Sequence, residues 1–518
     1  MTRSLIVALL LALGIALGLR ALSLGERPMH NDEAINAIKF RGLWERGSFK
    51  YDPNEYHGPS LFYATLALGR LTCAPDFEHY TEARLRWVTV LFGLALIALL
   101  PLLEDGLGRE GTVWAALFTA VSPAFVFYSR YFIHEMLLVA FTFLAFTAAW
   151  RYWRTRRLGW ILLAGAGLGL MSATKETFVL TLAAAAAALA LNEIWYRHID
   201  ASGPPLKTRS LPVNHLAAAL AVWLAVAALL FTSIFSNACG LLDSVRTYEP
   251  WLHRAEGASP HIHPWYFYFQ RLLFFHPGRG PVWTEALLLV LGLVAVRSAF
   301  ARKKLGDASG GLVRFLALYT VVLAVIYSLL AYKTPWCLLS FWHGMVLLAG
   351  VGAAVLLRGI RRRAVYWGVS LLLGLGAGHL VWQAWQLDTT YAADQRNPYV
   401  YAQTSPDVLD LVGQVEKLAA LSPEGHRMLT QVAAVEGDYW PLPWYLRRFQ
   451  QVGYWERLPA DLNAAALIVS PRFSDALTQT KAHQMGIFGL RPGVFLELYV
   501  RDDLWRQWLD KNQTAHTQ

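Results

Sequence analysis

The most restrictive feature of the sequence is a series of apolar runs, each about 17–22 residues long, along most of its length. An α-helix needs this length to cross the hydrocarbon core of a bilayer. Only 16% of the residues are charged and the mean hydropathy is +0.35, whereas about a quarter of an ordinary soluble domain is charged. The pattern predicts a polytopic α-helical membrane protein. It excludes a soluble enzyme, a disordered chain and a β-barrel, whose strands would be short and alternating.

We expect about eleven spans, and one further apolar stretch that does not cross. The first run follows Arg3 like a signal peptide, but no small-x-small cleavage site follows it, so we interpret it as an uncleaved helix. The stretch 59–73 is interpreted as a helix in the outer interface, because a span there would put the basic loops on alternating sides. The expected spans lie near 4–24, 86–104, 112–128, 135–150, 159–173, 177–195, 213–233, 282–298, 314–331, 336–357 and 365–386.

Basic loops orient these spans, because cytoplasmic loops carry an excess of Lys and Arg. Four clusters fall on one side, which we expect to be the cytoplasm. The net charge of +10 and the pI near 9.4 therefore indicate basic loops rather than a nucleic-acid site. The clusters are Arg151, Arg154, Arg156 and Arg157; Arg197, Lys207 and Arg209; Arg297, Arg302, Lys303, Lys304 and Arg314; and Arg358, Arg361, Arg362 and Arg363.

The tail from 388 to 518 has evenly spread charges and apolar runs no longer than strands. It predicts a small external soluble α/β domain after a membrane domain of residues 1–387. Ser405, Pro406 and Asp407 are typical of a helix start, so a helix should run to about Leu421. Short apolar runs predict strands at 428–434, 464–469 and 494–500, and the intervening pattern predicts helices at 475–483 and 502–510.

Two adjacent acids, Asp32 and Glu33, follow the first run on the expected external side. Acids at a membrane surface are costly to desolvate unless a basic or reactive group meets them. Acids are also common in the first turn of a helix, where they complement the macrodipole, so a solvated helix start explains the pair equally well. Consecutive side chains lie about 100° apart around a helix. One acid should therefore face a cavity while the other holds the loop.

Three short turns add polar groups at the same outer mouth: Arg130 and Glu135 at 129–135, Lys175 at 173–177, and Lys333 at 331–336. Taken singly, each turn has a simpler explanation. The arginine could be snorkelling to the membrane surface, and either lysine could belong to an interfacial anchor belt with nearby aromatic residues, which is the favoured interpretation of each lysine by itself. Their convergence on one face favours a site.

The loop 234–281 contains an H-x-H motif, His261 and His263. Two histidines are too few for a zinc site, so a structural or stacking role is favoured. The three cysteines, Cys73, Cys239 and Cys337, have neither metal-ligand nor disulfide spacing. We expect no cofactor, without excluding a divalent metal.

The order of these motifs resembles a known family. The Asp32-Glu33 pair precedes a Y-D-P-x-x-x-H-G-P segment from Tyr51, an S-R-Y-F-I-H-E turn, a T-K-E turn and a tail with W-P-L-P-W-Y-L-R at 440–447. This order is similar to the prokaryotic membrane family labelled flippase-activity-associated. That family is similar to the protein O-mannosyltransferases and the aminoarabinose lipid A transferases, which have the GT-C glycosyltransferase fold.

The resemblance implies roles for individual residues. Asp32 takes the place of the essential acid of the first external loop, with Glu33 as its acidic neighbour, and Glu135 takes the place of a second acid. Lys175 stands where these enzymes carry a lysine that binds the lipid phosphate. His57 stands where the lipid A transferases have a lysine. The D-x-D motif of the metal-dependent oligosaccharyltransferases is absent from the sequence.

The leading hypothesis is a membrane glycosyltransferase that moves a sugar from a polyprenyl-phosphate donor to a glycan, lipid or protein acceptor. We expect it in a prokaryotic cell membrane, acting at the external face, with membrane lipids and no nucleic acid as partners. Asp32 would be the general base, and Glu33 and Glu135 the neighbouring acids. Cations would stabilise the departing lipid phosphate. The expected donor-phosphate and substrate-binding residues are His57, Arg130, Lys175, Lys333 and His263.

The alternative is a non-enzymatic component of lipid-linked glycan translocation. A transporter should place ionisable residues near the middle of its spans. Here they gather at one mouth, which favours the enzyme.

Overall fold

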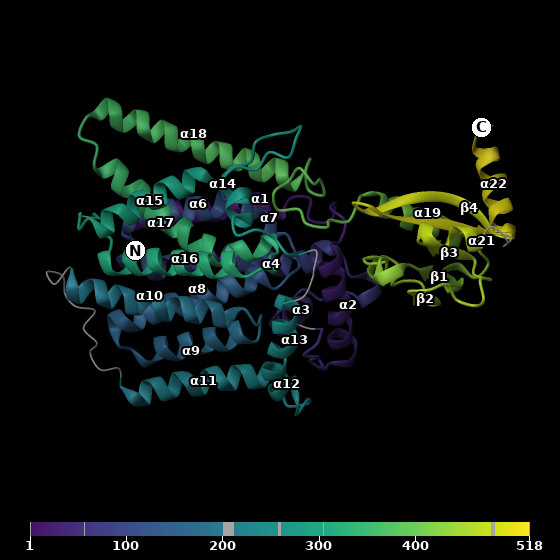
Figure 1. Ribbon diagram of the computed structural model, residues 1–518, viewed down its shortest axis with the longest axis horizontal. Coiled ribbons are helices and arrows are strands. Elements are labelled where there is room, and N and C mark those ends of the chain that lie inside the picture. Colours follow the sequence, from purple (N-terminus) through teal and green to yellow (C-terminus); the bar gives the residue numbers. More distant parts are fainter. Residues whose placement is uncertain are drawn as a thin grey trace.

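The computed structural model describes residues 2–55, 57–199, 212–256, 261–303, 305–477 and 482–516. Figure 1 shows a long helical bundle joined at one end to a smaller domain, which contains the five-stranded sheet. We call the end of the bundle that adjoins this domain the mouth.

Each of the eleven expected apolar runs forms helix. Among the described residues, eight helices are long and apolar enough to cross a membrane, or nine when the bent pair α6 and α7 is one span, and α9 and α15 are shorter apolar helices. The chain is thus a multi-pass membrane protein, as predicted. The bundle consists of α1 (Arg3–Ala21), α4 (Glu82–Leu99) with η2 (Leu100–Leu103) and α5 (Glu104–Leu107), α6 (Arg109–Val121), α7 (Pro123–Ser129), α8 (Glu135–Thr155), α9 (Leu158–Ser172), α10 (Phe178–His198), α11 (Val213–Phe231), α15 (Ala286–Phe300), α16 (Gly310–Leu329), η3 (Pro335–Leu338), α17 (Leu339–Arg358) and α18 (Arg363–Asp388).

The bend between α6 and α7 measures 56°. Pro123 begins α7, and a proline has no N–H to continue the preceding helix and clashes with its last turn. The bend turns the segment that leads into residues 129–135 across the mouth.

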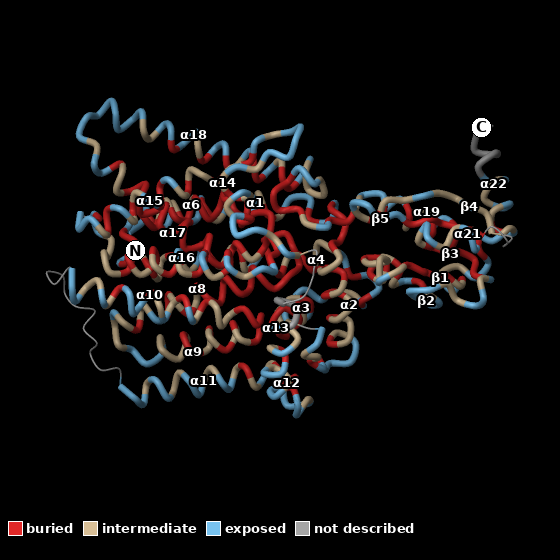
Figure 2. Tube along the Cα trace, in the orientation of Figure 1, coloured by how far each residue is buried: buried red, intermediate tan, exposed pale blue. Residues whose placement is uncertain are grey.

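The centre of the bundle is α17, whose span is 94% buried, whereas the span of α11 is 6% buried. Figure 2 shows the same contrast between a buried centre and exposed outer helices. Two glycines of α17 permit this close packing: a Cβ at Gly352 would meet the Leu291 carbonyl oxygen at 1.7 Å, and one at Gly350 would meet the Gly111 oxygen at 2.6 Å. Small residues let membrane helices approach closely.

The basic loops between α8 and α9, α15 and α16, and α17 and α18 lie at the end of the bundle away from the mouth (Figure 1). Lys207, Arg209 and Lys304 lie outside the described residues. The turns that carry Arg130, Lys175 and Lys333 lie at the mouth.

Shorter helices complete the mouth: α2 (Asn31–Arg46), α3 (Ser60–Leu71), α12 (Gly240–Arg246), α13 (Tyr248–Glu256) and α14 (Phe267–Leu273). The stretch 59–73, interpreted as a helix that does not cross, forms α3. With 12 residues it is about 18 Å long, shorter than the hydrocarbon core of about 30 Å.

The C-terminal domain is a five-stranded sheet in the order β2-β1-β3-β5-β4. β1 pairs in parallel with β2 and β3, with Thr430 opposite Val452 and Ala466, and β5 runs antiparallel to β3 and β4. Its apolar core lies between the sheet and α19. The elements are α19 (Asp407–Leu421), β1 (Thr430–Ala433), α20 (Leu442–Tyr445), β2 (Val452–Trp455), β3 (Ala466–Val469), α21 (Ser474–Leu477), β4 (Ala482–Arg491), β5 (Val494–Arg501) and α22 (Asp502–His516).

The small α/β domain, the helix to Leu421 and the three predicted strands are confirmed. The prediction of a helix over 475–483 is wrong at its end: α21 stops at Leu477, and residues 482 and 483 belong to β4, while 478–481 lie outside the described residues. β4 forms a hairpin with β5 whose turn contains Pro492 and Gly493. Gly493 has φ +78°, a conformation that favours glycine. This Pro-Gly pair is the turn signal that could have revealed β4.

Candidate functional site

The start of α2 fixes where the two adjacent acids point. His30 is its N-cap, and its Nδ1 accepts a hydrogen bond from the Asp32 N–H at 3.0 Å. The Glu33 carboxylate in turn accepts a hydrogen bond from the His30 N–H at 3.0 Å. This reciprocal arrangement is a capping box. Ser, Thr, Asp and Asn are the usual N-caps, so residue type alone does not mark His30 as one.

Glu33 is buried with no exposed surface. Arg86 donates from Nε and Nη2 to its two oxygens, both at 2.8 Å, and Arg27 Nη2 lies 3.4 Å away. The Phe132 N–H donates to it at 2.9 Å. Burial by itself raises the pKa of a carboxyl group, but Arg86 and Arg27 lower the pKa of Glu33 to about 2. Glu33 therefore holds α2 to α4 and to the 129–135 turn, and these contacts favour a structural role for it over the predicted catalytic one.

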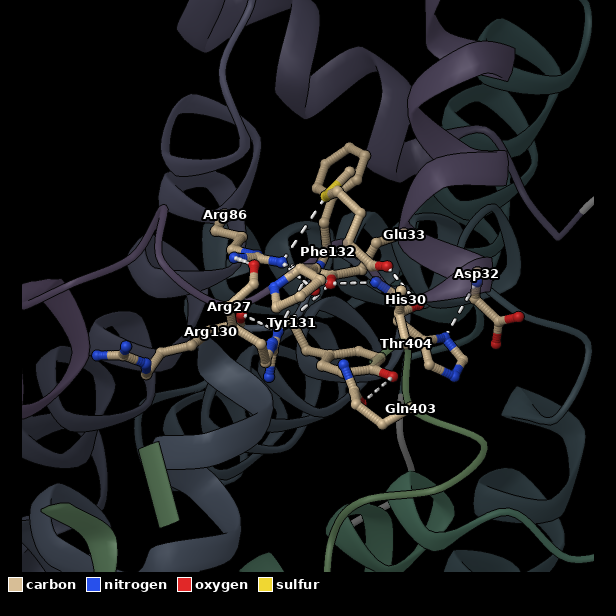
Figure 3. Close-up of polar contacts among 12 residues, drawn as sticks. Arg27, His30, Asp32, Glu33, Arg86, Arg130, Tyr131, Phe132, Gln403 and Thr404 are labelled. Carbon is tan, nitrogen blue, oxygen red and sulfur yellow. Dashed lines mark hydrogen bonds and ion pairs between the residues drawn. The ribbon is translucent and has the colours of Figure 1, made fainter. Parts of the chain in front are cut away.

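Asp32 points the other way. Its carboxylate faces away from the Glu33 cluster (Figure 3), and within the described ranges it makes no hydrogen bond or ion pair. It lies close enough to His261 and Tyr401 to interact with them electrostatically. Its lone pairs are thus available at the mouth, and its role as base stays a prediction.

Arg130 is placed differently from the prediction. Its guanidinium donates to the carbonyl oxygens of Leu22 and Ser23, and its Nε lies 3.3 Å from Asp388 Oδ1. These contacts tie the end of α1 to the end of α18. Figure 3 shows its guanidinium pointing away from Asp32. Most of its donors are thus used within the protein, which favours a structural role for Arg130 over binding of the donor phosphate.

Glu135 and Lys175 form a buried ion pair between the start of α8 and the turn that joins α9 to α10. Both groups interact electrostatically with Cys337, in the segment that follows Lys333. The ion pair therefore brings all three short turns of the mouth together. Lysine has three donors, so Lys175 can bind a further anion beside Glu135.

One face of α8, from Val139 to Trp153, lines a cavity of about 490 Å³ among α8, α10, α16 and α17. Its residues recur at spacings of three or four, so they share one face of the helix. Most of them are apolar, and the Glu135–Lys175 pair lies at the mouth end of this face. The α8 residues that line the cavity are Val139, Thr142, Phe143, Phe146, Ala149, Trp150, Tyr152 and Trp153.

His57 pairs with Glu176, with Nδ1 2.9 Å from the carboxylate oxygen. Its side chain is 40% exposed, whereas Glu176 is buried. The ring of the buried His134 lies 5.3 Å from that of His57, and His134 Nε2 lies 3.1 Å from the Gly58 carbonyl oxygen. Of this group, His57 is the one that a substrate can reach.

Lys333 is buried and holds the backbone of the mouth. Its Nζ donates to the carbonyl oxygens of His263, at 2.9 Å, and of Leu330. Burial lowers the pKa of this ammonium group. Two of its three donors are thus used by the protein, which leaves one for a phosphate.

His261 and His263 flank the hydroxyl group of Tyr401, at 2.6 and 3.2 Å. His263 also stacks on Phe267, with 4.1 Å between ring centroids. Burial, with the nearby Arg271, lowers the pKa of His263 to about 4. Among the residues that the structure describes, no group of three or more His, Cys, Asp or Glu could hold a metal ion. The stacking role favoured for the H-x-H motif agrees with these contacts.

Trp336 connects the two halves of the mouth. Its ring centroid lies 5.9 Å from that of His30, 6.1 Å from that of Tyr131 and 6.0 Å from that of Tyr401. The next residue is Cys337, beside the Glu135–Lys175 pair. The structure thus brings Asp32, Glu135, Lys175, Lys333, His57 and His263 to one mouth, while Glu33 and Arg130 are occupied in the framework.

The sequence analysis missed two buried groups that hold this framework. Arg86, the partner of Glu33, stands at the first position of an expected span, and a lone arginine there is a signal for a buried partner. Glu285 accepts hydrogen bonds from the Ser122 hydroxyl at 2.5 Å, the Tyr399 hydroxyl at 2.5 Å and the Trp342 Nε1 at 3.0 Å. It fastens the segment after α18 to the bundle.

The fold is that of a multi-pass membrane protein with a GT-C-like arrangement of helices. Residues 74–242 match the model of the family described as dolichyl-phosphate-mannose-protein mannosyltransferase. No curated protein matches the sequence.

Two solved structures share the fold. One is ArnT from Cupriavidus metallidurans bound to undecaprenyl phosphate, with 14% identity and a TM-score of 0.58 over 94% of this chain and 97% of that chain. The other is the archaeal oligosaccharyltransferase AglB from Archaeoglobus fulgidus, in complex with an inhibitory peptide and a dolichol-phosphate. Its identity is 13% and its TM-score 0.53, over 86% of this chain and 63% of that chain. The predicted similarity to GT-C mannosyl and aminoarabinose transferases is confirmed; the narrower family stays a prediction.

Proposed function

We propose that this protein is a membrane glycosyltransferase that transfers a sugar from a polyprenyl-phosphate donor to an acceptor at the mouth. The observation that carries the proposal is the buried Glu135–Lys175 pair at the mouth, one turn of α8 before Val139, which lines an apolar cavity. A lysine at the mouth, near an apolar cavity on the same side of α8, suits a ligand with an anionic head and a hydrocarbon tail. ArnT and AglB, whose folds are similar, were solved with such lipids, which supports the proposal.

The reaction follows from the charges at the mouth. The acceptor oxygen forms a bond to the anomeric carbon of the sugar while the bond from that carbon to the phosphate oxygen breaks. The electron pair leaves with the lipid phosphate, whose added charge Lys175 and the remaining donor of Lys333 stabilise. The proton of the acceptor hydroxyl passes to the Asp32 carboxylate. Glu135 holds Lys175 before the donor binds, and His57 and His263 contact the sugar or the acceptor.

Lys175 provides a test of donor binding. Replacing it by Met should weaken binding of undecaprenyl phosphate by about 1.5–3 kcal/mol, because a hydrogen bond to a charged group is lost. Titration of the purified protein with this lipid, followed by intrinsic fluorescence, measures the change. Lys417→Met, on an exposed face of α19, is the control.

The single variant leaves the buried Glu135 without its cation, so we pair it with Glu135→Gln. The double variant should show the same loss of affinity in a protein that folds normally. Undiminished affinity in both variants would return Lys175 to a purely structural role and remove the main support for the donor site.

We further propose that the protein lies in a prokaryotic cell membrane with the C-terminal domain outside. The basic loops at the opposite end of the bundle support this orientation. In a chain whose three cysteines are replaced by Ser, a cysteine introduced at the exposed Glu424 should react with an impermeant maleimide in intact cells, and one at the exposed Arg361 should react only after permeabilisation. The reverse pattern would contradict the orientation and the placement of the mouth with it.

A further inference from the structure

The two residues before the start of α2 are held from both sides by the C-terminal part of the chain. The Met29 N–H donates to the Tyr445 hydroxyl at 2.8 Å. The Thr404 hydroxyl donates to the Met29 carbonyl oxygen at 2.7 Å. Figure 3 shows Thr404 near His30, the residue that follows Met29. The backbone that leads into Asp32 is therefore fixed by residues about 370–420 positions later in the chain.

His30 carries this contact to Asp32. Its Nε2 lies 2.9 Å from the Tyr401 carbonyl oxygen, and a carbonyl oxygen only accepts, so Nε2 bears the proton. Nδ1 of the same ring is then the acceptor for the Asp32 N–H. One imidazole thus links the backbone of Tyr401 to the backbone of Asp32, with both nitrogens used.

The C-terminal domain itself contacts the helices beneath it through buried and hydrogen-bonded side chains. Trp444 is fully buried, and its Nε1 donates to Glu82 Oε1 at 2.8 Å. Arg447 donates to the Tyr80 carbonyl oxygen at 2.6 Å. Glu82 lies one turn before Arg86 on α4, and Arg86 binds Glu33. The W-P-L-P-W-Y-L-R segment therefore contacts the same helix, α4, whose Arg86 binds Glu33 at the start of α2.

We propose that Tyr401, Thr404 and Tyr445 of the C-terminal segment position the Asp32 carboxylate, through Met29 and His30, and so make the C-terminal domain a working part of the transfer site. These are positioning residues: they act on Asp32 through the backbone of residues 29–32. The inference rests on the proposed function, in which Asp32 is the base. Pre-organisation of a base matters because a displacement of about 1 Å can reduce the rate on the order of 10²-fold.

The first test is kinetic, in the full-length protein. The double variant Thr404→Val with Tyr445→Phe removes both bonds to Met29 and keeps the shape of both side chains. We expect kcat to fall about 10-fold or more while the donor KM changes less than about twofold, because the donor phosphate is held elsewhere. Tyr439→Phe is the matched control, since Tyr439 lies in the same domain and its hydroxyl makes no hydrogen bond among the described residues. Normal kcat in the double variant would overturn the proposal.

A substitution at His30 can separate the effect of its contact with Tyr401 from the effect of its N-cap hydrogen bond. A His30→Ser variant keeps an N-cap acceptor for the Asp32 N–H but has no group that reaches the Tyr401 carbonyl oxygen. It should lower kcat like the double variant, with thermal unfolding close to wild type. Full activity in His30→Ser would show that the cap alone positions Asp32 and would overturn the role of Tyr401.

The second test needs no turnover. In a chain whose three cysteines are replaced by Ser, an Asp32→Cys reporter should react with a small maleimide several-fold faster when Thr404→Val and Tyr445→Phe are also present. Tyr439→Phe should leave the reaction rate unchanged. If the Asp32→Cys reporter reacts faster in the double variant but the wild type transfers no sugar, the positioning role of Thr404 and Tyr445 is supported and the proposed function is refuted. An unchanged reaction rate of the reporter would refute the positioning role of Thr404 and Tyr445.

Discussion

An Asp32→Asn variant is expected to transfer sugar about 10²–10⁴-fold more slowly than the wild type, the usual contribution of a positioned general base. Asparagine has the same shape but cannot accept the acceptor's proton. The contacts that hold the start of α2 run through the Asp32 backbone and through Glu33, so the substitution should leave the fold and donor affinity nearly unchanged. Turnover of a polyprenyl-phosphate sugar and binding of undecaprenyl phosphate, measured on the same preparation, separate the two effects.

Glu33→Gln is the comparison for this experiment, since the two acids are neighbours in different surroundings. It should mainly reduce stability or expression. If well-folded Glu33→Gln were inactive and Asp32→Asn active, the assignment of the two acids would be reversed. Full activity in both would move the search for the base to Glu135.

Replacing Arg86 by Met is expected to lower the free energy of unfolding by about 3–5 kcal/mol, because breaking a buried ion pair leaves an uncompensated charge. Among the described residues, the cation left beside Glu33 would be the more distant Arg27, 3.4 Å away. Thermal unfolding in detergent, or the yield of folded protein, measures the effect. Arg84→Met is the matched control, two residues earlier on α4 and only partly buried. Equal stability of the two variants would contradict the role given to the Glu33 cluster.

The ion pairs of Glu33 also make part of the protein's stability depend on pH. The pKa of Glu33 in the folded protein is about 2, below the value of about 4.3 for an unperturbed Glu. A lowered folded-state pKa contributes stability that is complete above the unfolded value and is lost as the pH falls through the folded value. The contribution of Glu33 should therefore be constant above about pH 5 and decline only between about pH 4 and 2. A Glu33→Gln variant should lack this acid-dependent part of the unfolding curve.

The C-terminal domain shows where local sequence patterns were sufficient. Three elements were predicted because caps and short apolar runs are local properties. The helix-start signal at Ser405 and Pro406 predicted α19, and the apolar runs at 464–469 and 494–500 predicted β3 and β5. β2 was missed because its residues are only partly buried at the sheet edge, and an edge strand needs no continuous apolar run. β4 was missed, and its first two residues were assigned to a helix, because its strongest signal lies in the turn that follows it.

The sequence by itself determined the membrane class, the eleven apolar helices and the mouth at which Asp32, Lys175 and Lys333 gather. Span length and loop charge are properties of contiguous residues, and the bilayer acts on each segment separately. Only the tertiary structure decided which of two adjacent acids meets Arg86, that Glu135 pairs with Lys175, that Arg130 is occupied by the ends of α1 and α18, and that Tyr445 holds Met29. Partners in a buried network are chosen by which helices and domains pack together, and a buried charge must find its partner there because no water is present to replace it.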